Sequence, residues 1–280
     1  MSHRILVTGG TGLAGRWLAS GLGGLGAVLT TSLHGGDVSC DLRSRRQVDA
    51  LLAASGPTLV VHTAALTDVD GCEATPELAA ELNQGMVSTL VEALPEHTTL
   101  ILLSTDQVYP QASGPHAEKG VGPVNCYGLT KLAGEQEALR HRRTLVLRTN
   151  FFGPSQTAGR ESISDFVLTN LSQGKAITLF SDVLFSPLYL GTLVTIVEKV
   201  VRREVFGVLN AGSREGLSKA EFGLRVAKHK GLAVDKVTVG RSTSLSGRAP
   251  RPSDLRLDVR RLEGVLGQAM PTLAEEIAKL

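Results

Sequence analysis

A tyrosine and a lysine lie four residues apart in the segment Tyr127-Gly128-Leu129-Thr130-Lys131. If this segment is helical, the two side chains lie on one face. A free phenol has a pKa of about 10 and is a poor acid or base at neutral pH. A lysine cation one turn away favours the phenolate, so we expect Lys131 to lower the pKa of Tyr127. The pair indicates proton transfer to or from a substrate oxygen.

A second element, Ser104-Thr105-Asp106, strengthens this interpretation, because a Tyr-x-x-x-Lys pattern alone often occurs by chance. It lies at the end of a predicted strand over Leu100–Ser104, and ligand crevices open at the carboxyl ends of such strands in parallel sheets. Thr105 would then hydrogen-bond the same carbonyl oxygen as Tyr127. The plainer alternative is that Tyr127 is a half-buried tyrosine at a helix start.

The third chemical signal is the glycine-rich turn Thr8-Gly9-Gly10-Thr11-Gly12-Leu13-Ala14-Gly15. It follows a predicted strand and opens a predicted helix, as a dinucleotide-binding fingerprint requires. Gly9 permits the tight turn, Gly12 lets the backbone approach a pyrophosphate, and Gly15 lets the helix pack close to the strand. The helix N-terminus offers free N–H groups to the phosphates. A Walker loop is excluded, because no Gly-Lys-Ser/Thr follows.

The choice of cofactor depends on the end of the second predicted strand. A carboxylate for the ribose 2′-hydroxyl is expected about 20 residues after the glycines. Residues 31–34 are Thr, Ser, Leu and His instead, and Asp37 lies farther on, where we expect a turn residue. Arg16 and His34 could both meet a 2′-phosphate. We therefore predict NADPH, with NADH open as the alternative.

The elements that position these groups alternate between short apolar strands and longer helical patterns. Strands are predicted at 5–8, 27–31, 59–62, 100–104 and 145–148. Helices are predicted from the glycine turn to about 21, at 45–54, from 76 to about 94, and at 127–141. Apolar strands separated by helices indicate a parallel sheet that is covered on both faces. With right-handed crossovers the fold is α/β, a doubly wound parallel sheet of the Rossmann type.

The second half is less regular, and we assign it to a smaller C-terminal substrate-binding subdomain. The predicted division is a dinucleotide-binding Rossmann domain over 1–150 and a mainly substrate-binding part over 151–280, with a strand near 205–210 returning to the main sheet. Helical patterns cover 163–171, 189–201, 219–229 and 272–280, and 240–252 is predicted to be a long loop. Loops of this length are usually functional.

Composition narrows the class of protein. The chain has 280 residues, 42% of them hydrophobic and 20% charged, and a net charge of +2. This charge gives no support for a nucleic-acid partner, and we interpret the basic clusters at 43–46 and 140–143 as solvated helix faces. The cysteines Cys40, Cys72 and Cys126 have no zinc or redox spacing, which favours a reducing compartment.

The remaining bulk features concern membranes. A strand is predicted within four residues of Met1, which leaves no room for a signal peptide, and no apolar run reaches the roughly 18 residues of a spanning helix. We expect a cytoplasmic protein without a membrane partner.

With these pieces together, the chain resembles the extended short-chain dehydrogenase/reductases, and among them the dTDP-4-dehydrorhamnose reductase family. The resemblance covers nearly the whole chain. The matching segments are TGGTGLAG at 8–15, VVHTAALTDVDGCE at 60–73, LLSTDQVY at 102–109, YGLTK at 127–131, LRTNFFG at 147–153, SPLYLGTLV at 186–194, GVLNAGSREGLSKAEF at 207–222 and RPSDLRLD at 251–258.

The resemblance implies NAD(P)H-dependent reduction of the C4 ketone of a nucleotide-linked 6-deoxy sugar. Its catalytic triad would be Thr105, Tyr127 and Lys131, with Lys131 also holding the nicotinamide ribose. The implied cofactor-binding residues are Gly9, Gly12, Leu13, Gly15, Arg16, Asp41, Leu42, Ala64, Ala65, Tyr127 and Lys131. The implied substrate-binding residues are Thr105, Asn150, Phe151, Arg248 and Arg251.

Two groups of substrate residues have plainer alternatives. Arg248 and Arg251 could clamp a pyrophosphate bidentately, or be surface arginines of a flexible loop. Asn150, Phe151 and Phe152 follow the fifth strand and could line the pocket, but we expect one of the two phenylalanines in the core.

The chain also departs from the family pattern at three places. His62-Thr63 replaces a common Asn-Ala pair, and we expect His62 to be packed without a catalytic role. Trp17 occupies a position where some relatives carry a glutamate implicated in magnesium binding, so no metal is predicted. Residues 182–189 diverge around the pocket, which leaves the sugar open.

Alternative functions stay open at this point. An epimerase of nucleotide sugars would keep its nicotinamide bound and return the hydride. A non-catalytic regulatory subunit is a third reading, because a relative of this family is the accessory subunit of methionine adenosyltransferase, and a fold does not settle function. The nucleotide, the sugar, the C4 stereochemistry and the oligomeric state, for which a homodimer is open, are not given by the residues.

Overall fold

Runs of apolar residues form a central sheet whose two faces are both covered by helices. The computed structural model describes residues 2–280. Its seven parallel strands follow the order β3-β2-β1-β4-β5-β6-β11. Their bounds are β1 (His3–Thr8), β2 (Gly26–Ser32), β3 (Val38–Ser39), β4 (Leu59–His62), β5 (Thr99–Thr105), β6 (Thr144–Thr149) and β11 (Gly207–Ala211). The predicted doubly wound α/β class is confirmed.

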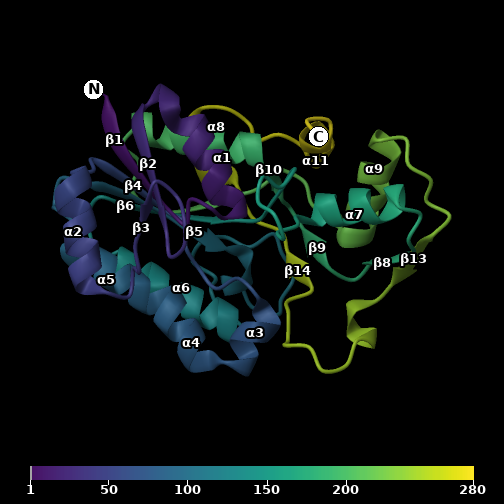
Figure 1. Ribbon diagram of the computed structural model, residues 1–280. Coiled ribbons are helices and arrows are strands. Elements are labelled where there is room, and N and C mark those ends of the chain that lie inside the picture. Colours follow the sequence, from purple (N-terminus) through teal and green to yellow (C-terminus); the bar gives the residue numbers. More distant parts are fainter. Residues whose placement is uncertain (1) are drawn as a thin grey trace.

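Helices from both halves of the chain form the two outer layers (Figure 1). One core cluster unites α1 (Leu13–Gly21), α8 (Leu190–Arg202) and α10 (Arg260–Leu266) with one face of the sheet. The other unites α2 (Arg45–Ser55), α5 (Met86–Ala93) and α6 (Cys126–Ala138) with the opposite face. The second half of the chain also contributes to the central sheet and its cover, because β11 is an edge strand and α8 and α10 pack on one face. The division at residue 150 remains a prediction.

A third core cluster holds the substrate half together around Phe152, Phe185 and Phe222. Its helices are α7 (Ile163–Ser172), α9 (Lys219–His229) and α11 (Leu273–Ile277). Its short strands are β7 (Phe151–Phe152), β8 (Ile177–Phe180), β9 (Leu184–Phe185), β10 (Leu188–Tyr189), β12 (Leu217–Ser218), β13 (Val237–Gly240) and β14 (Asp254–Leu255). They pair as β10-β7, β12-β9-β14 and β13-β8.

The helix predicted over 76–94 is less regular than expected. It consists of α4 (Pro76–Ala80), a π-helical turn (Glu81–Gly85) and α5, and α3 (Val69–Ala74) precedes it. At the π turn the side chain of Asn83 accepts a hydrogen bond from the Leu66 N–H at 2.8 Å and donates one to the Leu66 carbonyl at 3.1 Å. The irregular turn thus fixes the segment that follows β4, as such turns often do near functional sites.

Two further findings concern cysteines and membranes. Cys40, Cys72 and Cys126 are all free thiols. Within residues 2–280, no helix combines the length and the apolar character needed to cross a membrane.

Candidate active site

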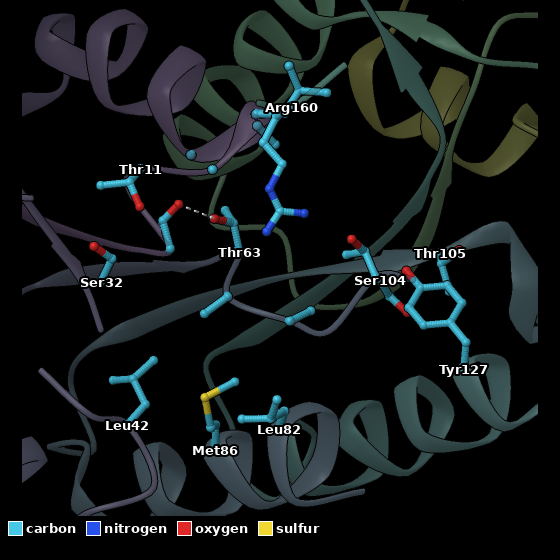
Figure 2. A pocket seen from close by; sticks show the side chains of 18 of the residues that line it. Thr11, Ser32, Leu42, Thr63, Leu82, Met86, Ser104, Thr105, Tyr127 and Arg160 are labelled. Carbon is cyan, nitrogen blue, oxygen red and sulfur yellow. Dashed lines mark hydrogen bonds between the residues drawn. The ribbon is translucent and has the colours of Figure 1, made fainter. Parts of the chain in front are cut away.

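A cavity opens at the carboxyl ends of the strands, where the strand order reverses between β1 and β4. It has a volume of about 670 Å³. The glycine turn, the segment after β4 and the start of α6 all contribute to its lining (Figure 2). This switch point is where open α/β sheets bind their ligands.

The glycine turn leaves no room for a side chain at Gly9 or Gly15. Gly9 has φ of +69°, and a Cβ added there would lie 2.7 Å from the Ala64 backbone nitrogen. A Cβ on Gly15 would lie 2.1 Å from the Gly9 carbonyl oxygen. Gly12 caps α1, so the first N–H groups of that helix are available to an anion. The backbone geometry fits a dinucleotide diphosphate.

Most of the predicted cofactor-binding residues line this cavity. They are Gly9, Gly12, Leu13, Gly15, Asp41, Leu42, Ala64, Ala65 and Tyr127. Arg16 is not among the lining residues, and its side chain is exposed on α1. Lys131 is likewise not among the lining residues.

The end of the cavity beside β2 differs from the expectation for a 2′-phosphate site. His34 is exposed and does not line the cavity, whereas Ser32, Leu33 and Arg43 do. We interpreted Arg43 as part of a solvated helix face, but it precedes α2, and its guanidinium pairs with Asp41 at 2.8 Å. Arg43 reaches the cavity because of the path of the chain after β3. The clustering of basic residues in the sequence does not indicate this path.

Asp37 has the structural role expected of a turn residue. Its carboxylate accepts hydrogen bonds from the N–H and the hydroxyl of Thr30, both at 2.8 Å. These bonds tie the chain after β2 to the strand and lower the pKa of Asp37.

Thr105 and Tyr127 come together at the other end of the cavity. Thr105 ends β5 and Tyr127 lies in the first turn of α6, and Figure 2 shows the phenol ring beside Ser104 and Thr105. The Thr105 hydroxyl accepts a hydrogen bond from the Gln107 N–H at 3.1 Å and donates one to Asp106 at 3.2 Å. The geometry places a hydroxyl and a phenol next to one another at the cavity wall.

The Tyr127 phenol is protonated at neutral pH. Tyr127 is only 8% exposed, and this burial raises the pKa of its phenol. The Thr105 hydroxyl lowers the same pKa by a smaller amount. The predicted lowering of this pKa by Lys131 is therefore wrong, because the effect of burial dominates. In this state Tyr127 can act as a proton donor.

Lys131 is directed at the sheet. The residue is 5% exposed, and its ammonium donates a hydrogen bond to the Leu103 carbonyl oxygen at 2.8 Å. Burial lowers the pKa of Lys131 to about 8, and the nearby Glu135 carboxylate partly opposes this effect. Lys131 is thus a cation at neutral pH that lies close to its titration range.

Hydrogen bonds of Asn125, which belongs to none of the predicted motifs, position the start of α6. Asn125 caps this helix by accepting a hydrogen bond from the Gly128 N–H at 2.8 Å. Its amide donates to Gln107 at 3.1 Å and to the Pro250 carbonyl at 2.9 Å. An asparagine before a helix signals a cap, but only the tertiary structure shows that it also joins two loops.

A buried ion pair connects the same helix, α6, to the central sheet. Arg148 on β6 pairs with Glu135 on α6 at 2.6 Å, and both side chains are almost fully buried. Arg148 also donates to the Tyr109 hydroxyl at 3.1 Å, and Ser104 donates to Glu135. The network links α6 to β5 and β6, the elements that carry the catalytic candidates.

On the substrate side, Asn150 and Phe151 line the cavity, whereas Phe152 is in the core. The Asn150 amide donates to the Asp106 carboxylate at 2.7 Å. Burial raises the pKa of Asp106. Asp106 is the third residue of the Ser-Thr-Asp element, and its place in the cavity could have been inferred from that position.

The two loop arginines lie outside the residues that line the cavity. Arg251 donates to Asp70 of α3 at 3.0 and 2.8 Å, and Arg248 lies 3.5 Å from the same carboxylate. These contacts hold the pKa of Asp70 well below its usual range. The arginines therefore pair with an acid at the rim of the site.

His62 is buried, and its Nδ1 lies 2.8 Å from the Thr8 hydroxyl oxygen. Burial lowers the pKa of His62 to about 3, so the imidazole is neutral. Within residues 2–280, no group of three or more His, Cys, Asp or Glu side chains is arranged to hold a metal ion. The absence of a bound metal remains a prediction.

Comparison with known proteins decides the family. The family model described as RmlD substrate binding domain matches residues 3–280. The chain belongs to the RmlD family. The family's relatives include sugar-nucleotide reductases, which supports an oxidoreductase.

Several relatives of this RmlD-family chain are similar over most of its length. A probable low-salt glycan biosynthesis reductase, Agl14, of Haloferax volcanii is 29% identical, covering 98% of the chain and 96% of the relative. A dTDP-4-dehydrorhamnose reductase of Mycolicibacterium smegmatis is 32% identical, covering 90% and 77%. Methionine adenosyltransferase 2 subunit beta of Danio rerio is 27% identical, covering 93% and 84%.

Among solved structures, the dTDP-4-dehydrorhamnose reductase of Bacillus anthracis in complex with NADP has a TM-score of 0.90. It is 21% identical, and the match covers 100% of the RmlD-family chain and 98% of that protein. At this identity the likeness shows the shared fold.

Proposed function

We propose that this protein uses NADPH to reduce the 4-keto group of a nucleotide-activated 6-deoxy sugar. The observation that carries the proposal is one cavity lined by both the dinucleotide-type glycine turn and the Thr105–Tyr127 pair. When bound, the cofactor would supply the hydride, which is chemistry that no side chain can provide.

The side chains would perform the proton transfer and the orientation. Tyr127, protonated because it is buried, would donate its proton to the carbonyl oxygen of the substrate, which yields a secondary alcohol. Thr105 would hold the same oxygen by a hydrogen bond. Lys131 would stabilise the phenolate left behind. To offer its cation to the nicotinamide ribose as well, it would have to turn away from the Leu103 carbonyl.

NADPH is favoured over NADH by the residues at the ribose end of the cavity. At the end of β2 the cavity is lined by Ser32 and Leu33, which bring no carboxylate to a 2′-hydroxyl. The Asp41 carboxylate farther along the lining is held by Arg43 at 2.8 Å. Arg43 adds a cation to the same end, in place of the predicted Arg16 and His34. The Bacillus anthracis relative is a complex with NADP, and NADH remains the alternative. Comparing kcat/KM for the two cofactors tests the choice, and a strong preference for NADH would contradict it.

We also place the protein in the cytoplasm, as its three free thiols suit a reducing compartment. Its proposed partner is a nucleotide sugar, held by Asn150 and Phe151 in the cavity and by Arg248 and Arg251 at the rim. A homodimer is a further proposal that sedimentation of the purified protein would test.

The experiment is a panel of nucleotide keto sugars incubated with the protein and NADPH. The account predicts stoichiometric NADPH oxidation with at least one dTDP-4-keto-6-deoxy sugar. An epimerase would instead convert a sugar without net NADPH loss. Tight NADPH binding with no turnover of any sugar would overturn the reductase and favour a non-catalytic regulatory subunit. One relative is methionine adenosyltransferase 2 subunit beta of Danio rerio.

A further inference from the structure

The loop between β7 and α7 brings an arginine over the cavity from the substrate half. Arg160 is exposed, yet it lines the same cavity as the glycine turn. Figure 2 shows its guanidinium reaching down between Thr63 on one side and Ser104 on the other. The side chain therefore lies between the diphosphate end and the Tyr127 end of the site.

The loop that carries Arg160 is attached to the dinucleotide-binding elements. The Thr157 hydroxyl donates to the Thr11 carbonyl in the glycine turn at 2.8 Å. The Trp17 indole of α1 donates to the Pro154 carbonyl at 3.0 Å. Through these two bonds, the position of Arg160 depends on the turn that receives the phosphates.

In the described part of the chain, the charge of Arg160 has no acidic partner. Within residues 2–280, its guanidinium makes neither an ion pair nor a hydrogen bond, whereas that of Arg43, the other cation of the cavity lining, is paired with Asp41 and Glu81. The neighbouring Glu161 also lines the cavity and brings a negative charge. Arg160 and the backbone N–H groups of the glycine turn line one cavity, and an unpaired guanidinium can bind phosphate oxygens bidentately.

We propose that Arg160 binds the diphosphate of the dinucleotide from the side opposite the glycine turn. This inference rests on the proposed cofactor. The turn and the N-terminus of α1 supply neutral N–H groups, and Arg160 supplies the positive charge that closes over them. The substrate half would thereby help to hold the cofactor before any sugar binds.

The test measures NADPH binding without a sugar substrate, by the fluorescence of the bound nicotinamide. Arg160→Ala should weaken NADPH binding roughly tenfold, which is typical of losing a charge-assisted contact. Arg160→Lys should recover part of the loss. Arg160→Ala should also flatten the dependence of the Kd on salt concentration, because an exposed charge pair is screened. A structural role of Arg160 would not produce this change.

Matched variants complete the test. Arg142→Ala removes an exposed arginine at the opposite edge of the sheet, before β6, and should leave the Kd unchanged. Glu161→Gln should keep or tighten NADPH binding. An unchanged Kd and salt dependence in Arg160→Ala would overturn the inference, whereas absence of NADPH binding in the unmodified protein would overturn the proposed cofactor instead.

Two ligand fragments distinguish the phosphate that Arg160 contacts. The affinity for 2′-AMP, which has no diphosphate, should be equal in Arg160→Ala and the unmodified protein. The affinity for dTDP should also be equal. A loss confined to dTDP would assign Arg160 to the nucleotide sugar and contradict its contact with the cofactor.

Discussion

At the scale of single residues, burial sets the protonation states of the two groups proposed to do the chemistry. Burial raises the pKa of Tyr127 and lowers that of Lys131 to about 8. Both shifts favour the neutral form, as expected for groups taken out of water. At neutral pH the phenol is still a donor and the lysine is still a cation, which suits reduction of a carbonyl.

The pKa of Lys131 predicts the pH dependence of the reaction. Below pH 8 the cation is present, and it is lost as the pH rises through about 8. We expect kcat/KM for the keto sugar to fall above this pH. Lys131→Met should lack this decline and be slower by at least tenfold at neutral pH, about the lower end expected for a residue that supports proton transfer. A wild-type profile that stays flat up to the pKa of free lysine would contradict the role.

The same shift predicts how stability depends on pH. The ordinary pKa of lysine is 10.5, so between about 8 and 10.5 the unfolded chain binds more protons than the folded one. The free energy of unfolding should therefore rise with pH across this interval. Urea denaturation would measure the rise, and Lys131→Met should reduce it.

At the scale of elements, the close approach of α6 to the loop after β5 fixes Tyr127 relative to Thr105. A Cβ on Gly128 would lie 2.3 Å from the Gln107 carbonyl oxygen, so only glycine allows this contact. The Asn125 cap joins the same two segments. The relative position of the proton donor and its neighbour thus depends on backbone packing.

Gly128→Ala should therefore push the helix away from the loop. We expect a loss of stability of about 1–3 kcal/mol, as for overpacking, and a kcat lowered by at least about tenfold because the donor is misplaced. Thermal unfolding and steady-state kinetics would measure both. The control is Gly264→Ala in α10, where an added Cβ meets no atom within 4 Å. Equal effects of the two substitutions would refute the packing argument.

The packing of each element also decides whether the element can be predicted from the sequence. The long strands were placed within about two residues, because a strand buried on both faces is an apolar run bounded by turns. The two-residue strands of the substrate half carry no such pattern. Arg43 and Arg160 lie in irregular segments, and their place at the cavity follows from tertiary folding. The positions of Thr105 and Tyr127 were accessible because strand ends and helix starts meet at one edge of the sheet.

At the scale of the whole molecule, the loop over residues 241–253 joins the substrate half to the rim of the cavity. Its anchor is the pairing of Arg251 and Arg248 with Asp70 on α3. An anionic substrate would compete with Asp70 for the two arginines. The positive charges of the two arginines would therefore be free to bind a ligand only when that ligand displaces the Asp70 carboxylate.

Removing the arginine and removing the charge of its acidic partner should therefore change the KM for the nucleotide sugar in opposite directions. Arg251→Ala should raise the KM for the nucleotide sugar several-fold, since a charge-assisted contact is lost, whereas Asp70→Asn should lower it. The Kd for NADPH should stay the same in both variants. Steady-state kinetics together with cofactor titration would separate the effects, and a KM that both substitutions leave unchanged would show that the arginines only anchor the loop.

The central claim is hydride delivery to a sugar ketone with Tyr127 as the proton donor. It is tested most directly with NADPH carrying deuterium at the transferable position and a dTDP-4-keto-6-deoxy sugar. We predict deuterium at C4 of the product with one NADP+ formed per sugar. Tyr127→Phe should bind NADPH normally but turn over at least about a hundredfold more slowly. Product without deuterium at C4, or undiminished turnover in Tyr127→Phe, would contradict the account.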